Sequence, residues 1–261
     1  ANCRAYTAHR KEEAERRAIE REKKRARLEK RQPDIAAAKA TAPSASTSAR
    51  RELAFLRAAL AHWHREHGPL RFMPAIKLPP PPEARIHFLS RNEAARFLSA
   101  ARKTPHLARF FLLGWYTGSR RAVLTGLRWS MVDLDAGVMH RKPHGAARTK
   151  KRAPPVRIGK RLLAHLRRWK RLDGDAGDFI VNYKGEPILR PLKSWERARV
   201  QAGLPEYVTP HILRHSRATH MLRQGVDPWQ AAGALGMSIK MLTERYGHHH
   251  PDWQGQAAEA R

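Results

Sequence analysis

The chain has 261 residues, of which 52 are Lys or Arg and 23 are Asp or Glu, giving a formal net charge of +29. Such an excess destabilises a compact fold by self-repulsion unless a polyanion relieves it, which points to nucleic acid. An anionic membrane is the rival partner, but no segment approaches the ~20 apolar residues that span a bilayer. A single cysteine, Cys3, excludes an internal disulfide framework and a cysteine-based zinc site. We therefore expect a soluble, intracellular protein that binds nucleic acid.

The first 73 residues predict a helical domain. Residues 4–31 are rich in Arg, Lys, Glu and Ala, which is typical of a solvated helix or of a basic helix lying on a phosphate backbone. Residues 36–48 are dominated by Ala, Ser and Thr and predict a low-complexity connection. Residues 51–67 predict a stronger helix, and their apolar stripe predicts a core contact. The stripe consists of Leu53, Leu56, Leu60 and Trp63.

A run of four prolines marks the clearest domain boundary. Pro79–Pro82 form a stiff, extended spacer and not a folded element. We therefore predict a Pro-rich linker over residues 74–87, which joins the helical domain to a second domain over residues 88–261.

The second domain opens with helix signals. Ser90 and Glu93 have the spacing of a capping box. Residues 107–116 predict an apolar helix suited to full burial, and residues 160–171 predict an amphipathic one.

Strand signals lie between these helices, at residues 131–134, 138–141 and 155–158. A short strand is predicted at residues 179–183, after which the pattern is helical. Helix boundaries are marked there by Thr209-Pro210, Gly225, Asp227-Pro228, Gly236 and Ser238. The predicted fold class is mainly α with a small antiparallel sheet (α+β).

The last predicted helices carry three chemically distinct groups. His211 and Arg214 are three residues apart and therefore share one face of a helix. Tyr246 follows on the final helix, and a phenol becomes a nucleophile once a base takes its proton and a phosphate is held nearby.

Attack on a DNA phosphodiester needs a cation clamp, a nucleophile, a base and an acid. Arg suits the clamp because its planar fork donates two parallel hydrogen bonds and keeps its proton. The candidates are Arg214 with Arg120 or Arg121 as clamp, Tyr246 as nucleophile, His211 as base, and a Lys of the basic loop 143–152 as acid. The sequence shows no carboxylate cluster typical of Mg²⁺ sites, so we expect a mechanism without a metal or cofactor.

These motifs, taken in order, resemble the catalytic domain of tyrosine recombinases, the phage integrase family, from about residue 89 to residue 251. Tyr116-Thr117-Gly118-Ser119-Arg120 resembles the first arginine motif and implies Arg120 rather than Arg121. His211-Ile212-Leu213-Arg214-His215 matches the His-x-x-Arg box, and Tyr246 lies nine residues after Met237 as the family's nucleophile does after its third His or Trp. Residues 50–67 resemble the end of the family's helical core-binding domain, whose start is missing.

The chain departs from the family pattern at two places. Met237 occupies the usual His or Trp position; it cannot donate a strong hydrogen bond, so we expect it to pack against the tyrosine helix. The loop before residues 156–158 differs in length, so the family's hairpin lysine is Lys150 or, next to it, Lys151.

The resemblance implies a site-specific recombinase or integrase that cleaves double-stranded DNA through a 3′-phosphotyrosyl intermediate, without metal or ATP. It further implies a homotetramer on DNA and a cytoplasmic, nucleoid-associated protein encoded by a bacterium or phage. The rivals are a type IB topoisomerase and a non-catalytic, DNA-binding integrase remnant, for which Met237 and the incomplete first domain are the motivation. The chain begins with Ala, which leaves open whether it is a fragment.

Several other residues have structural interpretations. We expect His215 and His220 to be structural histidines, and His248–His250 not to bind metal because adjacent side chains point in different directions. Trp129, Trp169 and Trp195 lie on apolar stripes and are expected in the core.

Overall fold

A computed structural model of the chain describes most of its 261 residues. The described residues are 2–28, 31–40, 45–80, 87–143, 145, 153–174, 177–255 and 258. They belong to two compact units, Ala1–Arg85 and Ile86–Arg261. Among the described helices, none combines the length and apolar character needed to cross a bilayer.

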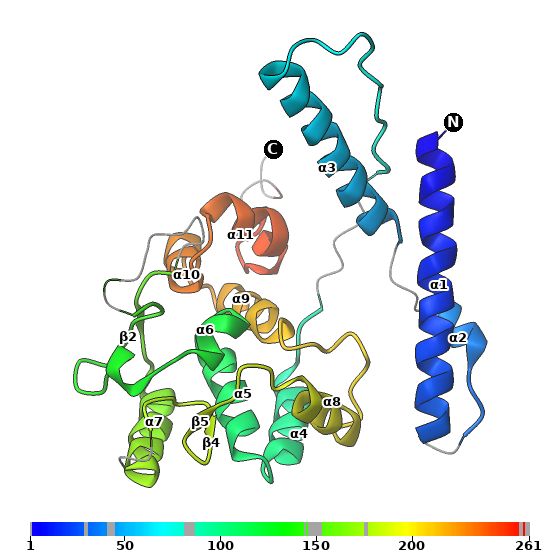
Figure 1. Cartoon of the computed structure of the whole chain (residues 1–261). Helices are drawn as coiled ribbons and strands as arrows, with labels where there is room; N and C mark the ends of the chain where they lie inside the picture. Colours follow the sequence, from blue (N-terminus) through cyan, green and yellow to red (C-terminus); the bar gives the residue numbers. More distant parts are fainter. Residues whose placement is uncertain are drawn as a thin grey trace. The chain divides into compact units, whose positions relative to one another are not determined.

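The N-terminal unit is helical (Figure 1). It contains α1 (Asn2–Leu28), α2 (Ile35–Ala40) and α3 (Ala45–Glu66). The prediction of a connection over residues 36–48 is therefore wrong, because α2 and the start of α3 lie within it. Alanine has the highest helix propensity of all residues, so an Ala-rich run forms a helix where its neighbours allow one.

Polar contacts join α1 to α3. Tyr6 donates a hydrogen bond of 2.6 Å to Glu52, and Arg10 donates two more to the same carboxylate, at 2.8 and 3.0 Å. The apolar contribution is small: Leu53 is buried, whereas Leu56 is 50% exposed and Trp63 53% exposed. The expectation that this whole stripe belongs to a core is wrong beyond Leu53, because small alanines occupy most of the buried positions.

The C-terminal unit is mainly helical and has two small sheets (Figure 1). Its α-helices are α4 (Arg91–Ala101), α5 (Pro105–Thr117), α6 (Arg121–Thr125), α7 (Lys160–Asp173), α8 (Leu192–Gln201), α9 (Ile212–Arg223), α10 (Pro228–Leu235) and α11 (Ile239–Tyr246). Short 3₁₀ turns cover Trp129–Met131 and Gly247–His249, and the strands are β1 (Val132–Asp133), β2 (Val138–Met139), β3 (Val156–Arg157), β4 (Asn182–Tyr183) and β5 (Glu186–Pro187).

In the described part of the C-terminal unit, the strands pair in hairpins and a short meander. The order β1-β2-β3 is antiparallel throughout, with two residue pairs in each ladder. β4 and β5 form a second hairpin whose two loop residues, Lys184 and Gly185, both have positive φ, as the tight turns of hairpins require. The predicted α+β class is confirmed; β5 falls where only helix was expected, because Pro187 and its neighbours give no alternating pattern.

Helix α5 is the centre of the larger core. It packs against α4, α6, α7 and α9, and its aromatic side chains meet those of α4 and α8. The Phe97 ring stacks on Phe111 at 4.8 Å between centroids and lies 4.3 Å from Trp195. Trp129, Trp169 and Trp195 are all buried, as expected.

The predicted caps of α4, α10 and α11 are confirmed, whereas α9 begins at Ile212, with His211 as its N-cap, and not at Thr209-Pro210. Ser90 and Glu93 form the capping box of α4. Asp227 accepts from the backbone N–H of Gln230 at the start of α10, and Ser238 accepts from that of Met241 at the start of α11. These caps fix where α10 and α11 begin, and α9, α10 and α11 pack together around a second, smaller core (Figure 1).

A buried ion pair holds α5 against α7. Arg109 forms a two-pronged pair with Asp173, both bonds being 2.7 Å, and also donates to the Ile180 carbonyl at 3.0 Å. Trp129 donates to the same carboxylate at 3.3 Å. Both side chains of the pair are largely shielded from water, so removal of one partner leaves the other charge uncompensated.

We therefore expect Asp173→Ala to lower the free energy of unfolding by about 3–5 kcal/mol, measured by urea denaturation followed by circular dichroism. Glu244→Ala is the matched control: Glu244 pairs with Lys240 at the surface, and loss of such a pair costs about 0–1 kcal/mol. Equal, small effects for the two variants would show that Asp173 contributes little to the fold.

Candidate active site

Arg214 lies in the first turn of α9 and binds two helix ends. Its Nη1 donates to the carbonyls of Gly118, at 3.0 Å, and Leu235, at 2.6 Å. The last carbonyls of a helix lack intrahelical partners and carry the negative end of the helix dipole. Arg214 therefore joins the C-terminal end of α5 to that of α10.

Arg141, two residues after the end of β2, makes a second connection between the same helix ends. Its Nη2 donates to the carbonyls of Thr117, at 3.1 Å, and Ala234, at 2.6 Å, and its Nε donates to the Ser119 hydroxyl at 2.9 Å. The side chain is 6% exposed, which is rare for an arginine. Burial of a guanidinium is tolerated here because these acceptors satisfy its N–H groups.

Arg120, two residues after Gly118 in the sequence, reaches the same region. It precedes α6, and its Nη2 lies 3.4 Å from the Gly236 carbonyl. Arg121, the first residue of α6, is exposed. The structure thus brings Arg120, Arg141 and Arg214 together, and leaves Arg121 in solvent.

Gly118 makes this close approach possible. It ends α5 in the left-handed conformation, with φ of 60°, which residues with a side chain rarely adopt. A Cβ at this position would collide with the Leu235 side chain. Glycine at position 118 therefore favours the close approach of the two helix ends that the arginines bind.

The arginines repel one another. Burial, followed by the charges of Arg214 and Arg120, lowers the pKa of Arg141 to about 10. Burial and the Arg120 charge likewise lower the pKa of Arg214 to about 10. Both remain charged at neutral pH, and within the described part of the chain every hydrogen bond of Arg141 and Arg214 goes to an uncharged oxygen. The cluster is therefore an electropositive site for an anion.

Tyr246 is buried at the end of α11. It is 2% exposed and belongs to the small core with Met237 and Leu242. Its hydroxyl lies 2.5 Å from Nδ1 of His215. Burial raises the pKa of Tyr246, and the charges of Arg245 and Arg214 oppose that shift.

His215 of α9 lies beside Tyr246, and His211, the N-cap of α9, lies beside His215. His211 and His215 are one helical turn apart, and their rings meet edge to face at 4.7 Å between centroids. Burial, the neighbouring His211 and nearby arginines lower the pKa of His215 to about 4. The pKa of His211 is also lowered, first by partial desolvation and then by Arg214 and Arg120. Both rings are therefore neutral at pH 7.

Met237 follows the glycine that ends α10 and is 8% exposed. Its neighbours in the small core include Leu242 and Tyr246 of α11. This burial supports a packing role for Met237. Lys150 and Lys151, the predicted acids, lie outside the described residues.

His220, also in α9, has a different partner. His220 bonds the Leu89 carbonyl at 2.8 Å, in agreement with a structural role. The described residues contain no group of three His, Cys, Asp or Glu side chains that could hold a metal ion, and this includes His248–His250.

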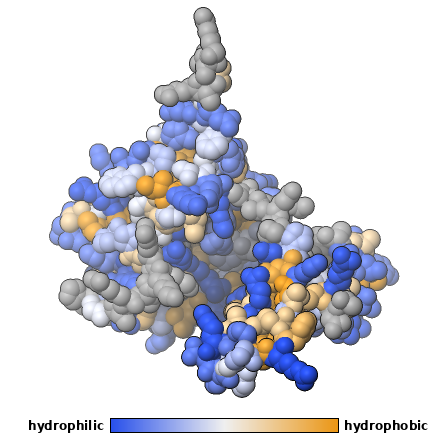
Figure 2. Space-filling view, turned by 90° about the horizontal axis from the view of Figure 1, so that it is seen from above, coloured by the Kyte–Doolittle hydropathy of each residue, from blue (hydrophilic) through white to orange (hydrophobic). Residues whose placement is uncertain are grey.

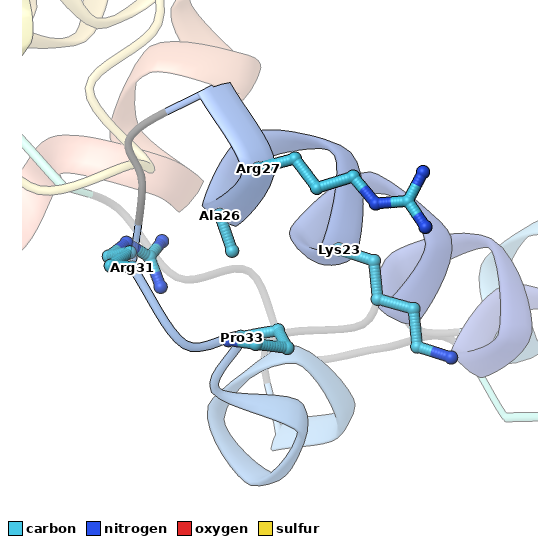
Figure 3. Close-up of a pocket in the computed structure, with 5 residues that line it drawn as sticks. All are labelled: Lys23, Ala26, Arg27, Arg31 and Pro33. Carbon is cyan, nitrogen blue, oxygen red and sulfur yellow. The ribbon is translucent and has the colours of Figure 1, made fainter.

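The N-terminal unit has a pocket at the end of α1. Figure 3 shows this pocket, of about 280 Å³, at the end of α1. Its lining residues are Lys23, Ala26, Arg27, Arg31 and Pro33. Hydrophilic side chains also dominate the coloured surface of the face drawn in Figure 2, in keeping with the net charge of +29.

Two residues of the site were not anticipated from the sequence. His215 was expected to be structural, yet its ring nitrogen contacts the Tyr246 hydroxyl. Arg141 was read only as part of a strand; the available signal was an arginine at the end of an apolar run, too weak to identify a buried cation.

Comparison with known proteins identifies the family. The sequence model of the phage integrase family matches residues 87–252, and the chain belongs to this family. The tyrosine recombinase XerC of Xylella fastidiosa (strain 9a5c) is 30% identical over 195 residues, which are 71% of this chain and 65% of XerC. The integrase of Salmonella phage P22 is 26% identical over 222 residues, which are 80% of this chain and 56% of that integrase. The chain thus spans less than two thirds of the length of these relatives.

Solved structures share the fold. The Tn1549 transposon integrase, in complex with transposon right end DNA, has a TM-score of 0.65 at 18% identity and covers 82% of this chain and 78% of its own. A lambda integrase dimer bound to a COC' core site has a TM-score of 0.62 at 21% identity, with coverage of 77% and 73%. The tyrosine-recombinase-like fold predicted for the second domain is confirmed.

The environment of His215 yields a pH prediction. An unfolded histidine has a pKa of about 6.5, which is higher than the pKa of about 4 for His215 in the folded protein. Protonation of His215 therefore favours the unfolded state. Its contribution to stability is present above about pH 6.5 and is lost as the pH falls towards 4. We expect ¹⁵N NMR of the folded protein to show a neutral His215 ring at pH 6, and His215→Asn to weaken the acid sensitivity of unfolding. A charged His215 ring at pH 6 would contradict the assignment.

Proposed function

We propose that the chain is a site-specific DNA recombinase or integrase in which Tyr246 is the nucleophile. The observation that carries the proposal is the position of its hydroxyl, hydrogen-bonded to a neutral histidine in a unit where Arg141 and Arg214 hold positive charge on helix ends. A phosphodiester placed against these guanidinium groups would supply the missing negative charge.

The proposed reaction is a transesterification. Oη of Tyr246 attacks phosphorus as the P–O5′ bond breaks, which leaves the DNA joined to the enzyme through a 3′-phosphotyrosine. Arg120 and Arg214 stabilise the negative charge of the pentacoordinate phosphate, and Lys150 or Lys151 protonates the departing 5′ oxygen. A histidine beside Tyr246 accepts its proton; His211 is the candidate that the sequence predicts.

Rejoining reverses the same chemistry. A 5′ hydroxyl of a partner strand attacks the phosphotyrosine and restores a phosphodiester, so the energy of the original bond is kept and ATP is not needed. The arginines supply the charge that a metal-dependent nuclease takes from its ions.

The proposed partner is double-stranded DNA, and strand exchange between two sites implies a homotetramer on DNA. The net charge of +29 and the DNA bound to the Tn1549 and lambda relatives support this partner. We propose further that residues 1–73 are a clamp or core-binding domain, that residues 74–87 are its linker and that residues 88–261 carry the chemistry.

Tyr246→Phe should abolish covalent cleavage and leave DNA affinity within about threefold, because one hydroxyl adds little to many phosphate contacts. A substrate is first selected from randomised nicked duplexes by recovery of the protein–DNA adduct; electrophoresis and filter binding then measure the two properties. An adduct formed by the Phe variant would remove Tyr246 as nucleophile. DNA binding without any wild-type adduct would favour the integrase-remnant alternative.

Arg120→Ala and Arg214→Ala should each slow single-turnover cleavage on the order of 100- to 1,000-fold, because each removes a charge-assisted donor from the transition state. Arg121→Ala is the matched control, since its side chain is exposed at the next position, and should change the rate by less than about threefold. The reverse order of sensitivity would move the first arginine of the site to Arg121.

A further inference from the structure

We propose that His215, and not His211, accepts the proton of Tyr246 during cleavage. The assignment rests on the proposed function and specifies one of its steps. It starts from the 2.5 Å separation between Nδ1 of His215 and Oη of Tyr246, which is within direct proton-transfer reach.

The packing of α9 against α11 produces this contact. His215 faces the last residue of α11, and its ring lies 5.8 Å from the tyrosine ring between centroids. His211, one turn earlier, touches the His215 ring edge to face. Within the described residues, the Tyr246 hydroxyl makes no hydrogen bond other than that to His215. Among the described residues, it is thus His215 and not His211 that hydrogen-bonds the reacting oxygen.

Other polar residues of α9 have a different pattern of contacts. The Ser216 hydroxyl accepts from the Leu89 N–H and donates to the Ile212 carbonyl, and His220 bonds the Leu89 carbonyl. The contacts with Leu89 connect α9 to the segment before α4, and they explain a structural role for Ser216 and His220. His215 instead uses Nδ1 for the side chain of the nucleophile.

The charges around His215 keep its ring neutral in the free protein. The groups that face it are His211 and Arg214 from α9, Arg245 and Tyr246 from α11, and His87 from the segment before α4. A neutral ring with its proton on Nε2 can accept at Nδ1. A bound phosphodiester would offset the positive charges of this group, which raises the basicity of His215 when substrate is present.

The step balances without a further reactant. The Oη–H proton moves to Nδ1 as the Oη–P bond forms and the P–O5′ bond breaks, and His215 becomes an imidazolium. The leaving oxygen takes its proton from the separate acid. In the rejoining step the attacking 5′ hydroxyl gives its proton back to that acid, and His215 returns its proton to Oη as the Oη–P bond breaks.

The test compares three variants on the duplex selected with the wild-type protein. His215→Ala removes the ring. His215→Asn places an amide near the former Nδ1 and can hold the Tyr246 hydroxyl, but cannot take up its proton. His220→Ala is the matched control, because it removes a neighbouring α9 histidine whose hydrogen bond goes to a backbone carbonyl. Thermal unfolding and DNA affinity are measured for each variant.

We expect both His215 variants to bind DNA and to cleave on the order of 100- to 10,000-fold more slowly than wild type, whereas His220→Ala stays within about tenfold. The wild-type rate should rise with pH to a plateau as His215 loses its proton; in His215→Ala that titration should vanish. Cleavage by His215→Asn within about threefold of wild type would overturn the proposal, since positioning alone would then suffice. An unchanged pH profile in His215→Ala would also overturn it.

A substrate with sulfur in place of the scissile 5′ oxygen separates a base from an acid, because the thiolate leaves without a proton. His215→Ala should remain slow on this substrate, and recovery would make His215 the acid and refute the assignment. Absence of any wild-type adduct would refute the proposed function itself, which distinguishes that failure from the failure of this step.

Discussion

The site depends on guanidinium groups bound to the carbonyl ends of helices. α5 and α10 both terminate in this region, and each would otherwise present unpaired carbonyls to a buried contact. Arg141 and Arg214 satisfy carbonyls of both helices at once. The hydrogen bonds that satisfy the carbonyls at the helix ends also hold the guanidinium groups in place. The backbone of α5 and α10 therefore determines where the two positive charges lie.

This arrangement also determines where the tyrosine lies. α10 ends at Gly236, and only Met237 and Ser238 separate that glycine from α11. Because Arg214 holds Leu235 and the Ser238 cap starts α11, the helix that carries Tyr246 begins at a fixed distance from the arginines. Met237, in this connection, is buried in the small core with Leu242 and Tyr246 and contributes no polar group.

Sequence reasoning succeeded where the signal is local. Ser90, Asp227 and Ser238 cap helices through backbone groups three residues away, so their roles can be predicted from spacing alone. The contact between His215 and Tyr246 joins residues 31 positions apart and depends on the crossing of α9 with α11. The three-residue spacing from Arg214 favoured His211 as the base. Spacing along one helix does not show which turn of that helix faces the partner helix.

Failures elsewhere have the same origin. Residues 36–48 have the composition of a connection, yet alanine favours a helix once α1 offers a surface to pack on. Arg141 is predicted only as a strand residue, because its burial arises from acceptors on two distant helices.

The repulsion within the arginine cluster links folding to ligand binding. Unfolding separates the guanidinium groups and restores their full hydration, so the free protein bears an electrostatic cost in its native state that the unfolded chain escapes. An anion that binds only the folded cluster adds RT ln(1 + [L]/Kd) to the free energy of unfolding. Stability and anion affinity are therefore linked. A substitution that reduces the repulsion would raise the free energy of unfolding of the ligand-free protein and lower its affinity for the anion.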